Sequence, residues 1–182
     1  MKLYTKKGDQ GKTSLYDGEK VSKTFSLIHA LGDIDELNSF IGMARAQVAG
    51  EMMGDGDDGA EDEGEVSEVF VEILDRVQRD LYRVGGDLAG LSAREGPVGE
   101  RDVEYLERTI DSLPCDVGRF VPPGAHGELS ARLHVCRSVC RRAERSVIGA
   151  VGDDEGERET TFPHILQYLN RLSDLFFAMA EC

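Results

Sequence analysis

The sequence contains no tryptophan, few cysteines and no apolar stretch long enough to cross a membrane as a helix. Residues 1–12 are polar, so they lack the apolar core of a secretory signal. The four cysteines form no C-x-x-C pair, and no nearby histidines complete a zinc pattern: Cys115, Cys136, Cys140 and Cys182. We therefore expect a cytoplasmic protein whose cysteines are small buried thiols, with residues 1–182 forming a single domain.

Lysine is absent after residue 23, and every later basic residue other than histidine is arginine. The net charge is −14, from 35 acidic and 21 basic residues, which argues against general nucleic-acid binding. An acidic, lysine-poor composition is typical of proteins adapted to high salt, and we take this as a hypothesis about habitat only. The six lysines concentrate positive charge at one end of the chain, where an anionic ligand could bind.

Apolar residues recur at helical spacing through most of the chain, starting with the stretch from Leu27 to Val48. Four further helices are expected at about 66–91, 100–113, 128–149 and 162–181. Prolines and glycines make 114–127 a loop, and no strand pattern competes with the helices. The pattern predicts an all-α protein, a five-helix bundle in one domain.

Residues 51–65 hold eight acidic residues, four glycines and no basic residue, which predicts a solvated, flexible acidic loop. A calcium-binding loop is the alternative, but the EF-hand pattern fails because Gly59 stands at the third ligand position counted from Asp55. We expect no specific metal site in this segment.

Residues 1–25 read as an irregular, glycine-rich lead segment around the stretch YTKKGDQGKTS. A Walker loop is excluded because Lys6 occupies the position of its first glycine and no buried strand precedes it. Gly8 and Gly11 nevertheless allow the backbone to approach a ligand closely, and Asp9 could hold Mg²⁺ or brace the loop. From spacing alone, phosphate binding and a charged, irregular terminus remain equal alternatives.

The fourth expected helix carries three arginines at i, i+4 and i+8, which we call the arginine ridge: Arg137, Arg141 and Arg145. Like charges at this spacing repel one another unless an anion lies over them. Carboxylates on the first helix are internal candidates for that anion, and a polyphosphate is the external one. For His134, one turn before the ridge, a core or interface role is favoured over proton transfer.

Five segments in order resemble the PduO-type ATP:corrinoid adenosyltransferases. They are residues 4–14, 21–23 (VSK), 32–39 (GDIDELNS), 137–145 (RSVCRRAER) and 168–174 (YLNRLSD). The resemblance covers nearly the whole chain outside 50–66 and implies a five-helix bundle that forms a homotrimer, with ATP bound at subunit interfaces.

The resemblance also implies roles for individual residues. The implied ATP contacts are Thr5, Lys6, Lys7, Gly8, Thr13, Ser14, Lys23, Arg141, Arg142, Glu144, Arg145 and Asn170. Asp35 and Arg137 would form an ion pair between subunits, and Phe120 would be the aromatic residue that displaces the lower axial ligand of cobalamin. Here the loop after Phe120 reads VPPGAHG, one residue longer than the family's usual pattern, and 51–65 looks like an insertion without a chemical role.

The implied reaction needs no side-chain nucleophile, because Co(I) of cob(I)alamin attacks the 5′-carbon of ATP and triphosphate leaves. The protein would position the reactants, and lysines, arginines and Mg²⁺ would stabilise the leaving group. A reductase or an adenosylcobalamin-dependent mutase would be a partner. The alternatives are a nucleotide-sensing or corrinoid-delivery protein on the same bundle, and an acidic interaction bundle that binds no ATP.

Overall fold

The computed structural model describes residues 4–16, 18–53, 61–91, 96–114, 122–152, 162 and 164–182. Within these residues there are five α-helices and two short β-strands, so the predicted all-α bundle is confirmed. In chain order the elements are β1 (Lys12–Ser14), β2 (Lys20–Ser22), α1 (Ser26–Met53), α2 (Glu61–Leu88), α3 (Glu100–Ser112), α4 (Glu128–Val151) and α6 (Ile165–Glu181).

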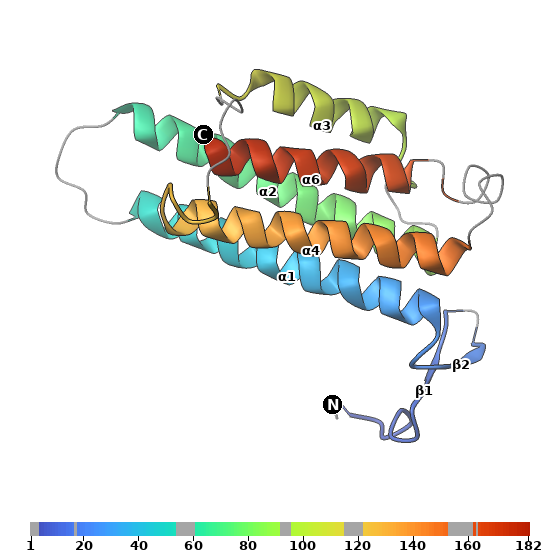
Figure 1. Ribbon diagram of the computed structural model, residues 1–182. Helices are drawn as coiled ribbons and strands as arrows, with labels where there is room; N and C mark the ends of the chain where they lie inside the picture. The colour runs from blue at the N-terminus through green and yellow to red at the C-terminus, as the bar shows by residue number, and fades with distance from the viewer. Residues whose placement is uncertain are drawn as a thin grey trace.

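The four long helices lie side by side, and the shorter α3 covers the outer face of α6 (Figure 1). Helix α1 packs against both α2 and α4, and α4 also packs against α6. The β1–β2 hairpin projects beyond the bundle at the end where α1 begins (Figure 1). None of the described helices combines the length and the apolar character needed to cross a bilayer.

Most of the side chains that the helical periodicity predicted to face inward are buried in the core. All seven apolar residues of the stripe predicted for the second helix are buried, from Phe70 to Leu88. Tyr168 and Phe176 of α6 are the largest fully buried side chains. Complete burial of a side chain such as Leu37 of α1 contributes about 1.5–3 kcal/mol. The buried apolar stripes of the helices are therefore the main source of stability.

The acidic loop predicted at 51–65 is wrong at both of its ends. Helix α1 continues to Met53 and α2 already begins at Glu61, so both helices extend into the predicted loop, and residues 54–60 lie outside the described part of the chain. Charge and glycine content predicted a loop, but adding a residue to an existing helix requires no new nucleation, so two packed helices extend past their apolar stripes.

The expectation of no strands is wrong for the lead segment, where β1 and β2 form an antiparallel hairpin. Thr13 pairs with Val21 at the centre of three residue pairs. The strands are too short and too polar for a periodicity signal. Gly18, with φ of 91°, adopts the left-handed backbone that the connecting turn requires.

The predictions for the histidine and the cysteines are largely confirmed. His134 is buried, and its Nε2 lies 3.3 Å from Oε1 of Glu181. This position in the core is the one that was expected. Cys136 and Cys140 are buried, and burial raises the pKa of Cys136 to about 12, so its thiol stays protonated and unreactive. Cys182 is exposed instead, because it follows the last residue of α6, and Cys115 lies outside the described residues.

Candidate functional site

The lead segment folds back on itself before it enters the hairpin. Backbone bonds join the Asp9 amide to the Lys6 carbonyl at 3.4 Å and the Gly11 amide to the Gly8 carbonyl at 3.2 Å. A further bond of 2.9 Å from the Lys23 amide to the Gly11 carbonyl ties this turn to the end of β2. Lys6 has φ of 61°, a strained conformation for a residue other than glycine and one that is enriched at ligand-binding sites.

This fold encloses a pocket of about 1000 Å³, which we call the lysine pocket. It is lined by Thr5, Lys6, Lys7, Gly8, Asp9, Gln10, Lys12, Thr13, Ser14, Lys20 and Lys23. The lining contains five lysines and one carboxylate residue, Asp9, in a protein whose net charge is −14. Such an excess of positive charge, together with hydroxyl donors, suits a polyanionic ligand.

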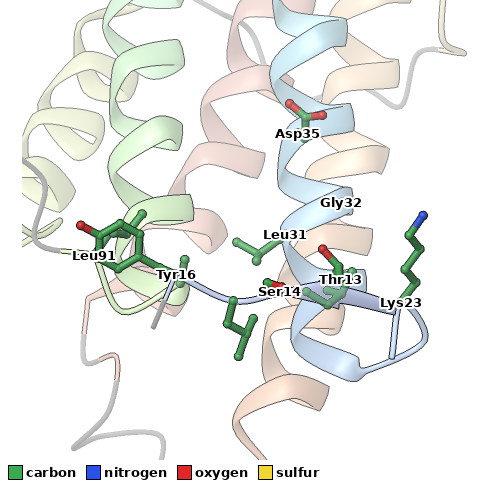
Figure 2. Close-up of a pocket in the computed structure, with 11 residues that line it drawn as sticks. Thr13, Ser14, Tyr16, Lys23, Leu31, Gly32, Asp35 and Leu91 are labelled. Carbon is green, nitrogen blue, oxygen red and sulfur yellow. The ribbon is translucent and has the colours of Figure 1, made fainter. Parts of the chain in front are cut away.

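A second hollow of about 660 Å³ adjoins the lysine pocket and shares Thr13, Ser14 and Lys23 with it. Its further lining is mostly apolar and comes from the hairpin, α1 and the chain after α2: Leu15, Tyr16, Ile28, Leu31, Gly32, Asp35, Ala89 and Leu91. Figure 2 shows Asp35 further along α1 from Leu31 and Gly32, away from the strand that carries Thr13 and Ser14. A charged cradle beside an apolar hollow can accommodate a ligand with both a polyanionic and a ring portion.

The arginine ridge lies on α4, away from both pockets, because no α4 residue lines either of them. Arg141 and Arg145 are exposed, Arg137 is half-buried, and none of the three forms an ion pair with a described residue. Nε of Arg137 is buried without a hydrogen-bond partner in the described structure. A buried donor of this kind needs an acceptor that the described residues do not supply, such as a water molecule, a ligand or a neighbouring chain.

The neighbouring Arg142 forms ion pairs with carboxylates of α1. Its Nε lies 3.2 Å from Oδ1 of Asp33, and its Nη2 contacts Oε2 of Glu36. Ser146 also donates to Asp33. Asp33 and Glu36 therefore pair with Arg142 and not with the ridge arginines, which remain available for another anion.

Asp35 and Arg137, the predicted ion pair, do not meet within one chain. Asp35 is exposed and lines the hollow on α1, whereas Arg137 has no ion-pair partner among the described residues. The prediction that they pair between subunits remains a prediction.

Asn170 lies on α6 and contacts α4, the helix of the ridge. Its Nδ2 is 3.4 Å from Oε1 of Glu144, and its Oδ1 accepts a 2.8 Å bond from Arg171. Glu144 is thereby engaged by Asn170 within the chain. Phe120, the predicted aromatic wedge, lies outside the described residues, as do its neighbours 115–121.

Sequence reasoning missed several contributors to the two pockets, and three of them show why. Lys20 lines the lysine pocket, while Tyr16 and Leu91 line the hollow. The clustering of lysines was a usable signal for Lys20. Neither Tyr16 nor Leu91 belongs to a helical stripe, so periodicity carried no information about them. Among the described residues, no group of three histidine, cysteine, aspartate or glutamate side chains could hold a metal ion.

The N-terminal segment of this helical bundle forms a lysine-lined pocket suited to a polyanionic ligand, and it lacks the Walker-loop pattern. The family model described as "Cobalamin adenosyltransferase" matches residues 3–182, and the chain therefore belongs to this family.

Curated relatives are similar over the whole chain. A corrinoid adenosyltransferase of Bacillus subtilis (strain 168) is 39% identical, with 100% of this chain and 86% of the relative covered. Corrinoid adenosyltransferase MMAB of Homo sapiens is 35% identical, with coverages of 99% and 68%. A solved structure of a PduO-type ATP:corrinoid adenosyltransferase variant from Lactobacillus reuteri, complexed with cobalamin and ATP, superposes with a TM-score of 0.75 at 29% identity. It covers 99% of this chain and 92% of the other.

Proposed function

We propose that this protein transfers the 5′-deoxyadenosyl group of ATP to the Co(I) centre of a corrinoid and releases tripolyphosphate. Family membership over residues 3–182 supports this activity, as do relatives named for it. The observation that carries the proposal is the lysine pocket, which gathers five lysines into one concavity of an otherwise strongly acidic protein.

In the proposed reaction the corrinoid supplies the nucleophile, and the protein supplies positioning and charge. The electron pair of Co(I) forms a cobalt–carbon bond to C5′, while the C5′–O bond breaks and its electrons leave with the triphosphate. Lys6, Lys7 and Lys23 would bind the triphosphate and stabilise its growing charge as it departs, assisted by the hydroxyls of Thr13 and Ser14. The adjoining apolar hollow would accommodate a ring portion of a reactant.

We place the complete site between subunits. The lysine pocket is lined only by residues from 5–23, and the arginine ridge lies on α4 outside both pockets. We infer that Arg141 and Arg145 reach a triphosphate in the lysine pocket from a neighbouring copy, because no α4 residue lines the pocket of its own chain. The family resemblance implies three copies, and the unpartnered Nε of Arg137 supports an intersubunit partner, which we propose is Asp35.

Three further assignments complete the proposal. Mg²⁺ would accompany the triphosphate, with Asp9 as the carboxylate available in the lysine pocket. Phe120 would exclude a lower axial ligand from the cobalt and so make Co(II) easier to reduce. The protein would act in the cytoplasm, with a reductase or an adenosylcobalamin-dependent mutase as its partner.

The test is anaerobic turnover of ATP with chemically reduced cob(I)alamin, followed by the loss of Co(I) absorbance and by the release of tripolyphosphate. Stoichiometric tripolyphosphate and a light-sensitive adenosylated product are the expected result. ATP binding without release of tripolyphosphate would contradict the transferase and favour a nucleotide-sensing or corrinoid-delivery protein. Absence of ATP binding would leave only an interaction bundle.

A further inference from the structure

Four side chains from three helices connect the ridge helix to the outer face of the bundle. Glu144 on α4 accepts from Nδ2 of Asn170 on α6 at 3.4 Å, and Oδ1 of Asn170 accepts from Nη1 of Arg171 at 2.8 Å. Nε of Arg171 donates to Oε1 of Glu107 on α3 at 2.8 Å. The chain of contacts therefore runs from α3 through α6 to α4.

These contacts determine which way the amide of Asn170 faces. A primary amide has an acceptor oxygen at one end and two N–H donors at the other. Arg171 has no acceptor, so it can only bind the oxygen, and the Glu144 carboxylate, when ionised, can only accept from the nitrogen. Rotating the amide by 180° would set its N–H groups against the donor Arg171 and its oxygen against the acceptor Glu144. One N–H remains unpaired within the described part of the chain.

Arg171 is itself held in place by Glu107. Its planar guanidinium uses Nε for Glu107 and Nη1 for Asn170, so both bonds depend on one rigid group. Both charged side chains are close to half exposed, at 40% and 45%, so the pair contributes little to stability. Its geometric effect on Asn170 is therefore separable from folding.

We propose that Arg171, oriented by Glu107, is a positioning residue that keeps an N–H of Asn170 directed at an acceptor atom of the nucleotide. The inference rests on the proposed function, in which Asn170 contacts ATP. It assigns to Glu144 the holding of Asn170, since a carboxylate in direct contact with a triphosphate would repel it. Arg171 acts through Asn170 and does not touch the substrate.

The test is a double-mutant cycle on the intact enzyme, with KM for ATP and kcat measured separately. Arg171→Met keeps the apolar stem and removes both bonds. We expect it to raise KM for ATP by about three- to tenfold, the equivalent of one lost hydrogen bond, with less change in kcat. In an Asn170→Ala background the same substitution should add nothing, because its target is gone. Glu107→Gln should raise KM in the same direction by a smaller factor.

The matched control is Arg108→Met. Arg108 is exposed on α3, and among the described residues its side chain bonds only to the backbone carbonyl of Glu104. It should leave KM unchanged, and thermal unfolding of every variant should stay close to that of the native protein. An equal effect of Arg171→Met in both backgrounds, or no effect in either, would overturn the inference and leave the transferase intact. An unchanged KM in Asn170→Ala would overturn both the inference and the proposed ATP contact of Asn170. Loss of turnover in the unsubstituted protein would instead overturn the proposed function.

Discussion

A β-carbon placed on Gly8 would lie 3.1 Å from Nζ of Lys23, closer than side chains normally pack. Both residues line the lysine pocket, and the backbone bond from Lys23 to Gly11 holds their two segments together. The absence of a side chain at Gly8 therefore allows the Lys23 ammonium to approach the turn of the lead segment. Gly8 has no left-handed backbone, so its importance lies in this close approach.

Gly8→Ala should displace the Lys23 ammonium and weaken ATP binding. We expect KM for ATP to rise by about three- to tenfold, with the free energy of unfolding nearly unchanged, because Gly8 is far from the core. Steady-state kinetics and chemical denaturation measure the two effects. Gly50→Ala on α1, where an added β-carbon meets nothing within 4 Å, is the matched control. Wild-type KM in Gly8→Ala would show that Lys23 does not bind the nucleotide.

Arg141→Ala should impair ATP use far more than folding. Arg141 is exposed and has no ion pair among the described residues, so its removal breaks no ion pair there. Loss of one charge-assisted bond to phosphate lowers kcat/KM for ATP by roughly 10- to 100-fold. Arg132→Ala, on the same helix and paired with Glu128, controls for the loss of one positive charge. Equal kinetics in the two variants would remove the ridge from the ATP site.

Asp35→Arg should weaken assembly and corrinoid turnover, because it would place a second cation opposite Arg137 of a neighbouring subunit. The reversed pair, Asp35→Arg with Arg137→Asp, should restore much of the loss. Analytical ultracentrifugation and Co(I) turnover report the two effects. Glu104→Arg makes the same charge change on the exposed side of α3 and should leave assembly intact. Native mass and turnover in Asp35→Arg, or a reversed pair no better than either single variant, would exclude the intersubunit pair.

Asp102 on α3 should make part of the stability dependent on pH. Burial alone would raise the pKa of Asp102, but hydrogen bonds from Arg83, Gly99 and Arg76 outweigh it and lower this pKa below its ordinary value near 3.8. A lowered carboxyl pKa contributes stability above the pKa of the unfolded chain. That contribution is lost as pH falls through the lower, folded value. The bonds are short, at 2.9 Å from Arg83 and 3.0 Å from Arg76.

Asp102→Asn should lower the free energy of unfolding by about 2 kcal/mol at pH 7, because two arginines lose a charged acceptor. The difference from the native protein should begin to shrink below about pH 4, where Asp102 of the unfolded chain becomes protonated, and should be smallest below the lowered pKa of the folded protein. Urea denaturation at several pH values measures it. Asp111→Asn, exposed on the same helix, should change little. A difference that stays constant to pH 3 would mean that packing, and not the charge, is responsible.

Much of the fold was predictable because helix formation here follows a local period. The stripes beginning at Leu27 and Phe70 identify long helices. The second stripe is buried throughout and the first from Ile34 onward, whereas Leu27 and Leu31 are partly buried. The hairpin was not predictable, because three polar residues per strand carry no alternation signal. The end of α1 at Met53 and the start of α2 at Glu61 were not predicted, because the acidic, glycine-rich composition there resembles a loop.

The sequence by itself determined the helical bundle, the confinement of lysine to the first 23 residues and the spacing of the arginine ridge. Only the tertiary structure decided which arginines of α4 are free of ion pairs among the described residues and so available to bind an anion. Arg142 and Arg141 are neighbours in sequence, yet Arg142 pairs with Asp33 and Glu36, because successive residues of a helix point in different directions. The tertiary structure likewise decided which way Asn170 faces, since that depends on partners from α4 and α3 that lie 26 or more residues away in the sequence.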